Sequence, residues 1–532
     1  MTADAADKRD WTPRVSSAML ARLTARAAVA EPSDAAPVEA PFTGETLGDV
    51  RLGRVADVER AAAAARAAQA AWARRPVGER SAILLRFHDL LIERAHEALD
   101  VVQLETGKAR RDALEEVLDV AIQVRYYAHT AAAYLRPRRR KGTLPVATRA
   151  WELHHPRGVV GIITPWNYPL TLTTGDAIPA LLAGNGVVGK PDVQTPFSCL
   201  WAADLLAEAG LPDGLLQVVT GRGAPLGVPI IEAVDYLLFT GSTAAGRVVA
   251  TEAAERLTPC GLELGGKNPL LVLPDADLGK AVRGAARAIC SNTGQSCISV
   301  ERLYVHADVY DAFVPALAEA LRSVRLGAQL DFAPDVGSLK SAKQLAAVSG
   351  HVDDAVAKGA EVLAGGRARP DLGPYFYEPT LLAGVTEEMA LCRDETFGPV
   401  AAVYRCDSVD DMVERANDSA FGLNASIWTR DVAVGRAIAA RLQVGGVNIN
   451  EGYAATWSSA SPMGGVKDSG SGRRHGAPGI LQYTQTQTVA AQRLIPVGTP
   501  PFLRHDQYAR AMLLGLRALR RVPWFDRLGR GS

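Results

Sequence analysis

The chain has 532 residues, of which 48% are hydrophobic and 22% are charged, a composition typical of a globular protein with a large buried core. Its 58 lysines and arginines balance its 58 aspartates and glutamates, so bulk charge favours neither nucleic acid nor an anionic membrane as a partner. The N-terminal residues lack the apolar core of a signal peptide, and no stretch reaches the roughly twenty apolar residues of a membrane-spanning helix. We therefore expect a cytoplasmic protein.

The six cysteines follow no disulfide or zinc-site spacing, which indicates free thiols in a reducing compartment. No cluster of histidine, cysteine and aspartate has ligand spacing, and we expect no metal site. The adjacent His154 and His155 would point to opposite faces of a strand, so we interpret them as structural.

The first part of the chain is predicted to consist of packing elements. Residues 1–40 show no sustained period and are expected to form a loosely packed arm, and residues 42–52 indicate a short hairpin. The basic run 136–142 is interpreted as a solvated rim in preference to a phosphate-binding patch. Apolar spacing predicts three helices, over residues 56–75, 83–91 and 117–135.

From Trp151 onward, short apolar runs alternate with helical segments and glycine turns. This pattern is typical of parallel strands in βαβ units, and it predicts a doubly wound α/β sheet with a ligand crevice at the carboxyl ends of its strands. The runs cover residues 158–164, 186–190, 216–220 and 236–240.

Polar or glycine turns follow all four runs, and we expect them to line one crevice. Gly241 and Ser242 would let the backbone approach a pyrophosphate, and a helix that opens at Thr243 would aim its N–H groups at that anion. The standard GxGxxG fingerprint is absent because Thr243 stands at the second glycine position, so this motif alone also fits an ordinary turn.

Two further residues have the character of reacting groups. Glu263 lies in an apolar strand that ends in two glycines, where burial would raise its pKa towards that of a general base. Cys297 follows small and amide residues that predict a tight turn presenting a nucleophilic thiol, although a small buried hydrophobe is the alternative interpretation. Together with the amide of Asn167, the acid Glu395 and a nucleotide crevice, Glu263 and Cys297 favour covalent catalysis with hydride transfer.

Seven segments stand in the order found in the aldehyde dehydrogenase superfamily, which the chain resembles over roughly residues 40–490. Within that superfamily it is most similar to actinobacterial NADP-dependent succinate-semialdehyde dehydrogenases, chiefly in residues 190–197, 297–302 and 349–354. The seven segments are residues 165–169, 189–191, 239–243, 263–267, 294–297, 395–399 and 462–465.

The resemblance implies a mechanism. Cys297 would attack the aldehyde carbon, and the Asn167 amide with the Cys297 backbone N–H would hold the oxyanion. Hydride transfer to nicotinamide would leave a thioester, which water activated by Glu263 hydrolyses; a CoA-acylating enzyme generally lacks this acid, and a binding-only relative would lack Cys297 or Glu263. The implied cofactor-binding residues are Thr164, Pro165, Trp166, Lys190, Val193, Gly221, Gly241, Ser242, Leu264, Glu395 and Phe397.

The choice of cofactor depends on position 193, three residues after the lysine. Many NAD-dependent relatives carry a glutamate there, which binds the adenosine ribose and would repel a 2′-phosphate. Val193 removes that repulsion, so NADP is favoured, while the neighbouring Asp192 keeps NAD open.

The resemblance implies a small aldehyde as substrate, and succinic semialdehyde is favoured. Arginines that some relatives use for its distal carboxylate are replaced by Gly175 and Ser291, so recognition is expected elsewhere, with Arg125 and Ser458 among the candidates. A broad specificity for aliphatic or aromatic aldehydes is the alternative. The expected pocket residues are Tyr126, Ile298, Tyr453, Trp457 and Ser461.

The expected architecture is an aldehyde dehydrogenase-like α/β fold, with a Rossmann-type cofactor domain, an α/β catalytic domain and a small β element that joins subunits into a homodimer or homotetramer. A basic amphipathic helix near residues 508–522 is expected to dock on its own oligomer and not on a membrane. The expected divisions are an arm (1–40), a cofactor domain (41–138 and 156–262), a catalytic domain (263–450), an oligomerisation element with a substrate-pocket loop (139–155 and 451–492) and an extension (493–532).

Overall fold

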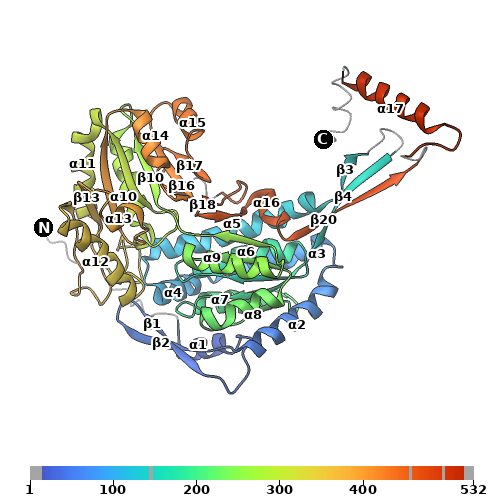
Figure 1. Ribbon diagram of the computed structural model, residues 1–532. Helices are drawn as coiled ribbons and strands as arrows, with labels where there is room; N and C mark the ends of the chain where they lie inside the picture. Colours follow the sequence, from blue (N-terminus) through green and yellow to red (C-terminus); the bar gives the residue numbers. More distant parts are fainter. Residues whose placement is uncertain (1–14, 143–147, 455–457, 494–497, 521–532) are drawn as a thin grey trace.

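The computed structural model describes residues 15–142, 148–454, 458–493 and 498–520. Two large α/β sheets with their helices form the body, and a narrow three-stranded sheet projects from it (Figure 1). The α/β fold class predicted from the sequence is confirmed.

The first large sheet has six strands in the order β19-β9-β8-β5-β6-β7. Its strands are parallel except β19, which runs antiparallel to β9. Every residue of β5, β6 and β8 is buried, as expected for strands covered by helices on both faces, and the four predicted runs all contain strands. The strands are β5 (Val159–Ile163), β6 (Gly186–Lys190), β7 (Leu216–Val218), β8 (Tyr236–Thr240), β9 (Cys260–Glu263) and β19 (Gly470–Ser471), connected by α6 (Pro169–Leu182), α7 (Phe197–Glu208), α8 (Gly223–Ala233) and α9 (Thr243–Glu255).

The second large sheet has seven strands in the order β12-β13-β14-β11-β10-β16-β17, all parallel except β12. Its strands are β10 (Asn268–Val272), β11 (Val300–His306), β12 (Glu361–Ala364), β13 (Thr380–Ala383), β14 (Val400–Cys406), β16 (Asn424–Trp428) and β17 (Gly446–Ile449). Its helices are α10 (Leu278–Cys290), α11 (Ala307–Arg322), α12 (Ala342–Ala357), α13 (Ala390–Arg393), α14 (Val409–Asn417) and α15 (Val432–Ala439).

The N-terminal part is packed more closely than the sequence predicts. Leu20 and Leu23 are buried in the core, and the hairpin begins before residue 42, because its first strand lies within the expected arm. The third predicted helix begins earlier, since buried polar residues such as Asp112 and Glu116 interrupt the apolar period. The elements are α1 (Ser17–Thr24), β1 (Ala35–Ala40), β2 (Glu45–Arg51), α2 (Val55–Trp72), α3 (Val77–Glu93), the unpredicted α4 (Ala95–Thr106) and α5 (Arg110–Leu135).

The projecting sheet is antiparallel and has the order β20-β4-β3, formed by β3 (Arg138–Lys141), β4 (Thr148–Pro156) and β20 (Thr484–Gln492). Beyond its outer end lies α17 (His505–Leu519), which stands away from the body (Figure 1). Most of β20 is exposed, and so are Met512, Leu513, Leu514 and Leu516 of α17. Within the described ranges, no helix combines the length and apolar character needed to cross a membrane.

Candidate active site

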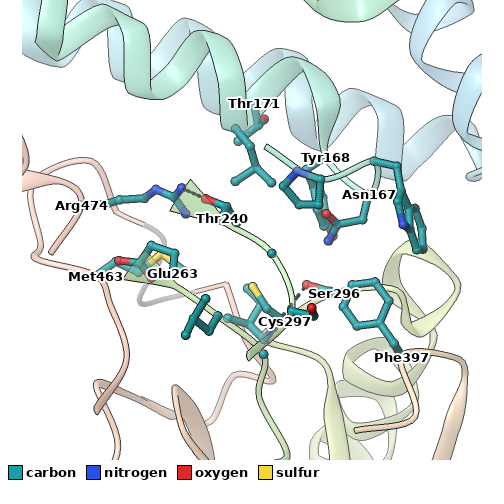
Figure 2. Close-up of a pocket in the computed structure, with 18 of the residues that line it drawn as sticks. Asn167, Tyr168, Thr171, Thr240, Glu263, Ser296, Cys297, Phe397, Met463 and Arg474 are labelled. Atoms are coloured by element: carbon teal, nitrogen blue, oxygen red, sulfur yellow. Dashed lines mark hydrogen bonds between the residues drawn. The ribbon is translucent and has the colours of Figure 1, made fainter. Parts of the chain in front are cut away.

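A cavity lies at the carboxyl ends of β5, β8 and β9 and faces the segment that leads into β11 (Figure 2). The structure brings many of the predicted site residues together around it, although they come from distant parts of the chain. Those that line it are Pro165, Trp166, Asn167, Gly241, Ser242, Glu263, Leu264, Cys297, Ile298, Glu395 and Phe397.

The turn before Cys297 has an unusual backbone. Asn292 and Thr293 adopt left-handed conformations, with φ of 51° and 57°, and such strain in non-glycine residues is concentrated at functional sites. Gly294 is also left-handed, and a Cβ there would overlap the carbonyl of Gly398, so the turn packs tightly against the loop that carries Glu395. Cys297 itself is only partly buried and lines the cavity.

Asn268, the first residue of β10, fixes the backbone of this segment. Its side-chain Nδ2 donates to the carbonyl oxygens of Cys297 at 2.8 Å and Ser299 at 2.7 Å. Its Oδ1 accepts from the backbone N–H of Asn424 at 2.9 Å. A single amide therefore ties the cysteine segment to two strands of the second sheet.

The surroundings of the Cys297 thiol determine its protonation. Burial raises its pKa to about 12, the charges of Glu395 and Glu263 add to this, and Arg474 opposes it. The thiol is therefore protonated near neutral pH, and its activation requires a group that accepts the proton.

Glu263 is the last residue of β9 and is buried. Burial raises its pKa to about 7, Arg474 and Arg473 lower it, and Asp176 raises it. A carboxylate with a pKa near neutrality is matched to proton transfer as a general base.

Asn167 lies in the loop between β5 and α6. Its Nδ2 donates to the carbonyl of Gln295 at 3.0 Å, which uses one of its two hydrogens, and its Oδ1 has no partner among the described residues. Its own carbonyl accepts from Lys108 Nζ at 2.7 Å and from Asn292 Nδ2 at 3.2 Å. These bonds hold the amide at the edge of the cavity that also contains Cys297.

Other residues of the cavity wall suit a dinucleotide. Ser242 caps α9 and accepts from the N–H of Ala245, and Gly241 and Ser242 line the cavity at the start of this helix, where the sequence predicts a pyrophosphate. A Cβ at Gly246 would overlap Leu264, so glycine lets the helix approach β9 closely. Trp166 and Phe397 meet edge to face at 5.5 Å.

Two ionisable side chains, Lys190 at the end of β6 and Glu395 on the cavity wall, also have hydrogen-bonding capacity to spare. Lys190 ends β6, and its Nζ donates to the carbonyl of Pro191 at 3.1 Å; its other N–H groups have no acceptor in the described parts of the chain. Glu395 accepts from the N–H of Gly266 at 2.8 Å, and burial raises its pKa to about 8, with a further increase from Glu301. An ammonium and a carboxyl with unused hydrogen-bonding capacity fit the hydroxyls of two riboses.

Four residues predicted for the cofactor do not line the cavity. Thr164 shares a hydrogen bond with the hydroxyl of Thr173 at 2.6 Å, and Lys190 ends a neighbouring strand. Val193 packs against the core of the first sheet, and Gly221 forms the turn after β7 with φ of 152°.

The predicted substrate pocket differs from the observed cavity, where Ile298 alone is found among the four described members of that set. Tyr126 shares a hydrogen bond with the hydroxyl of Tyr134 at 2.5 Å, because its place on α5 directs it along the helix. Tyr453 donates to Glu115 at 2.9 Å, and Ser461 is exposed. Trp457 lies outside the described residues. Arg125 and Ser458, named as carboxylate candidates, do not line the cavity either.

Sequence reasoning missed a buried ion pair that lines the cavity. Arg474 Nε and Nη2 donate to the two carboxylate oxygens of Asp176 at 2.9 and 2.8 Å, and Nη2 also donates to Thr240 Oγ1. The partners are 298 positions apart, so no spacing signal connects them. His475 and Met463 also line the cavity and stand in the same glycine-rich segment, whose glycines were the available hint.

Comparison with known proteins agrees with this geometry. A model of the aldehyde dehydrogenase family matches residues 29–489. A protein of Mycolicibacterium smegmatis, named provisionally as an NADP-dependent succinate-semialdehyde dehydrogenase, is 51% identical over 515 residues, which cover 96% of this chain and 99% of that protein.

Two solved structures are also similar. The succinate-semialdehyde dehydrogenase from Burkholderia pseudomallei is 37% identical with a TM-score of 0.84, over 87% of this chain and 96% of its own. An NADP-dependent enzyme from E. coli is 35% identical with a TM-score of 0.84, over 87% and 96% of the two chains. These matches confirm the resemblance carried by the seven segments, and the chain belongs to the aldehyde dehydrogenase family.

Proposed function

We propose that this aldehyde dehydrogenase oxidises succinic semialdehyde to succinate with NADP. The observation that carries the choice of substrate is the 51% identity, over nearly the whole of both chains, to the mycobacterial protein provisionally named for this activity. The Burkholderia pseudomallei enzyme with the same substrate in its name supports it at 37% identity.

The chemistry is assigned to three residues that line the cavity. Cys297 Sγ releases its proton to solvent water and attacks the aldehyde carbon, and the Asn167 amide and the Cys297 backbone N–H stabilise the negative oxygen that forms. When bound, NADP supplies the acceptor for the hydride. Glu263 then takes a proton from the water that hydrolyses the thioester, which releases the acid and frees the sulfur.

The residues that would hold the cofactor lie on both sides of the crevice. Lys190 and Glu395 would bind the two riboses, and the backbone at Gly241 and Ser242 would receive the pyrophosphate. Val193 leaves room for a 2′-phosphate. The carboxylate of Asp192 accepts from the backbone N–H and side-chain amide of Gln194 at 2.9 and 3.2 Å, and this engagement weakens the case for NAD.

A broader aldehyde specificity is the second candidate. Leu172, Ile298 and Met463 give the cavity an apolar wall, which favours uncharged chains. Initial rates with succinic semialdehyde, hexanal and benzaldehyde, each with NADP and with NAD, separate the two candidates. A clear preference for succinic semialdehyde with NADP supports the proposal, and a preference for either uncharged aldehyde refutes it; Cys297→Ser is the inactive control in every series.

The same proposal includes the organisation of the subunit. Residues 41–138 and 156–262 would bind the cofactor, residues 263–450 would form the catalytic domain, and the projecting sheet β20-β4-β3 would join subunits of a cytoplasmic homodimer or homotetramer. The exposed apolar residues of α17 support docking on a neighbouring copy. Light scattering on the purified protein tests the assembly, and a monomer at micromolar concentration would refute it.

A further inference from the structure

Arg474 is the one arginine or lysine among the described residues that line the cavity. It precedes the short helix α16 (Gly476–Leu481), and its side chain is 8% exposed against 9% for its partner Asp176. Two bonds to that carboxylate hold the guanidinium in a fixed orientation, together with one to Thr240, which Figure 2 shows. Its Nη1 makes no hydrogen bond within the described ranges.

This guanidinium lies beside the predicted base. Thr240 and Glu263 are the last residues of β8 and β9 and are register partners in a parallel pair. Side chains at paired positions of neighbouring strands point to the same face of a sheet, so the group that binds the Thr240 hydroxyl lies next to the Glu263 carboxyl. Both side chains line one cavity with Cys297.

We propose that Arg474 is a positioning residue for the general base: clamped by Asp176 and Thr240, its charge keeps the Glu263 carboxylate ionised and directed into the cavity while the thioester is hydrolysed. The negative charge of Asp176, the partner of Arg474, opposes ionisation of the Glu263 carboxyl. The proposal rests on the assignment of Glu263 as the base, but not on the identity of the aldehyde.

The charged and titratable groups that face Glu263 come from several elements. Arg474 and Arg473 follow β19, Asp176 lies on α6, Tyr236 lies on β8, and the Cys297 thiol faces it across the cavity. Burial is the main influence and raises the pKa of Glu263 to about 7; of the two arginines, Arg474 lowers it more. Arg473 is half-buried and donates to the carbonyls of Gly465 and Gly472, so solvent screens its charge more than that of the buried Arg474.

The test measures the rate of thioester hydrolysis against pH, as the steady-state rate that follows the burst of reduced cofactor. The acidic limb of this profile is the pH range in which the rate rises as Glu263 ionises. Arg474→Met removes a cation and should move the acidic limb upward by about one pH unit, whereas Asp176→Asn removes an anion and should move it downward. Arg474→Lys keeps the positive charge, so the acidic limb should stay at the pH of the wild type. Arg473→Met is the matched control and should move it less than Arg474→Met.

Loss of Arg474 leaves Asp176 buried without its partner, so the double variant Arg474→Met with Asp176→Asn provides a neutral, folded comparison whose limb should return towards that of the wild type. Both succinic semialdehyde and hexanal are used, and the shifts should be the same for each. A limb that stays in place, or that moves the same way in both single variants, overturns the proposal. A rise in KM confined to succinic semialdehyde, with the limb unmoved, also overturns it and makes Arg474 a ligand of the substrate carboxylate. Failure to oxidise succinic semialdehyde would refute only the proposed substrate.

Discussion

The buried pair of Lys108 and Glu116 supports the oxyanion side of the site, and its removal has a predictable cost. The Nζ of Lys108 lies 2.5 Å from Glu116 Oε1, and neither side chain is exposed to solvent. Glu116 Oε2 accepts from the N–H groups of Leu170 and Thr171 in the first turn of α6, at 2.9 and 3.1 Å. Lys108 also donates to the carbonyl of Asn167, so the pair fixes both the helix start and the loop before it.

Lys108→Met leaves the Glu116 carboxylate buried without its cation, which should reduce the free energy of unfolding by about 3–5 kcal/mol. Asn167 keeps only the longer bond from Asn292 on its carbonyl, at 3.2 Å, so its amide loses part of its orientation. Misplacing one oxyanion donor should lower kcat by about tenfold to a hundredfold, equivalent to roughly 1.4–2.7 kcal/mol of barrier.

Denaturant unfolding measures the first effect and initial rates at saturating aldehyde measure the second. The double variant Lys108→Met with Glu116→Gln should recover much of the stability because no buried charge is left unpaired, but it should not recover kcat. Lys280→Met is the control, since that lysine is 68% exposed and should change stability by less than about 0.5 kcal/mol. Unchanged stability in Lys108→Met, or full recovery of kcat in the double variant, would refute the reasoning.

Three further predictions concern the base, the cofactor and the tail. Because Glu263 must be ionised to accept a proton and its pKa is raised to about 7, thioester hydrolysis should accelerate as pH rises through neutrality. Glu263→Gln should keep the burst of reduced cofactor and lose the steady-state rate. A flat pH profile in the wild type would contradict this prediction. Val193→Glu should lower the NADP to NAD ratio of kcat/KM by about tenfold or more through repulsion of the 2′-phosphate, and an unchanged ratio would count against our cofactor assignment. Deleting residues 493–532 should weaken self-association in light scattering while kcat per subunit is retained. If the shortened and full-length chains form assemblies with the same number of subunits at every concentration, docking of α17 on a neighbouring copy is excluded.

Much of the local structure could be predicted from the sequence. Short apolar runs between glycine turns identified the strands of the first sheet, because burial on both faces leaves a continuous apolar pattern that can be read locally. Cys297 and Glu263 stood out because a cysteine among amides and an acid in an apolar strand are locally unusual. Short segments such as the cysteine turn carry their own backbone requirements, as Gly294 shows.

Which side chains share the cavity depends on the tertiary structure. Arg474 and Asp176 are 298 positions apart, and Lys108 reaches Asn167 across 59 positions, so no periodicity or spacing connects them. Tyr453 was predicted to line the substrate pocket, but its hydroxyl donates to Glu115 and it does not line the cavity. Pairing between buried charges depends on how distant elements pack, and a local sequence pattern carries no information about that geometry.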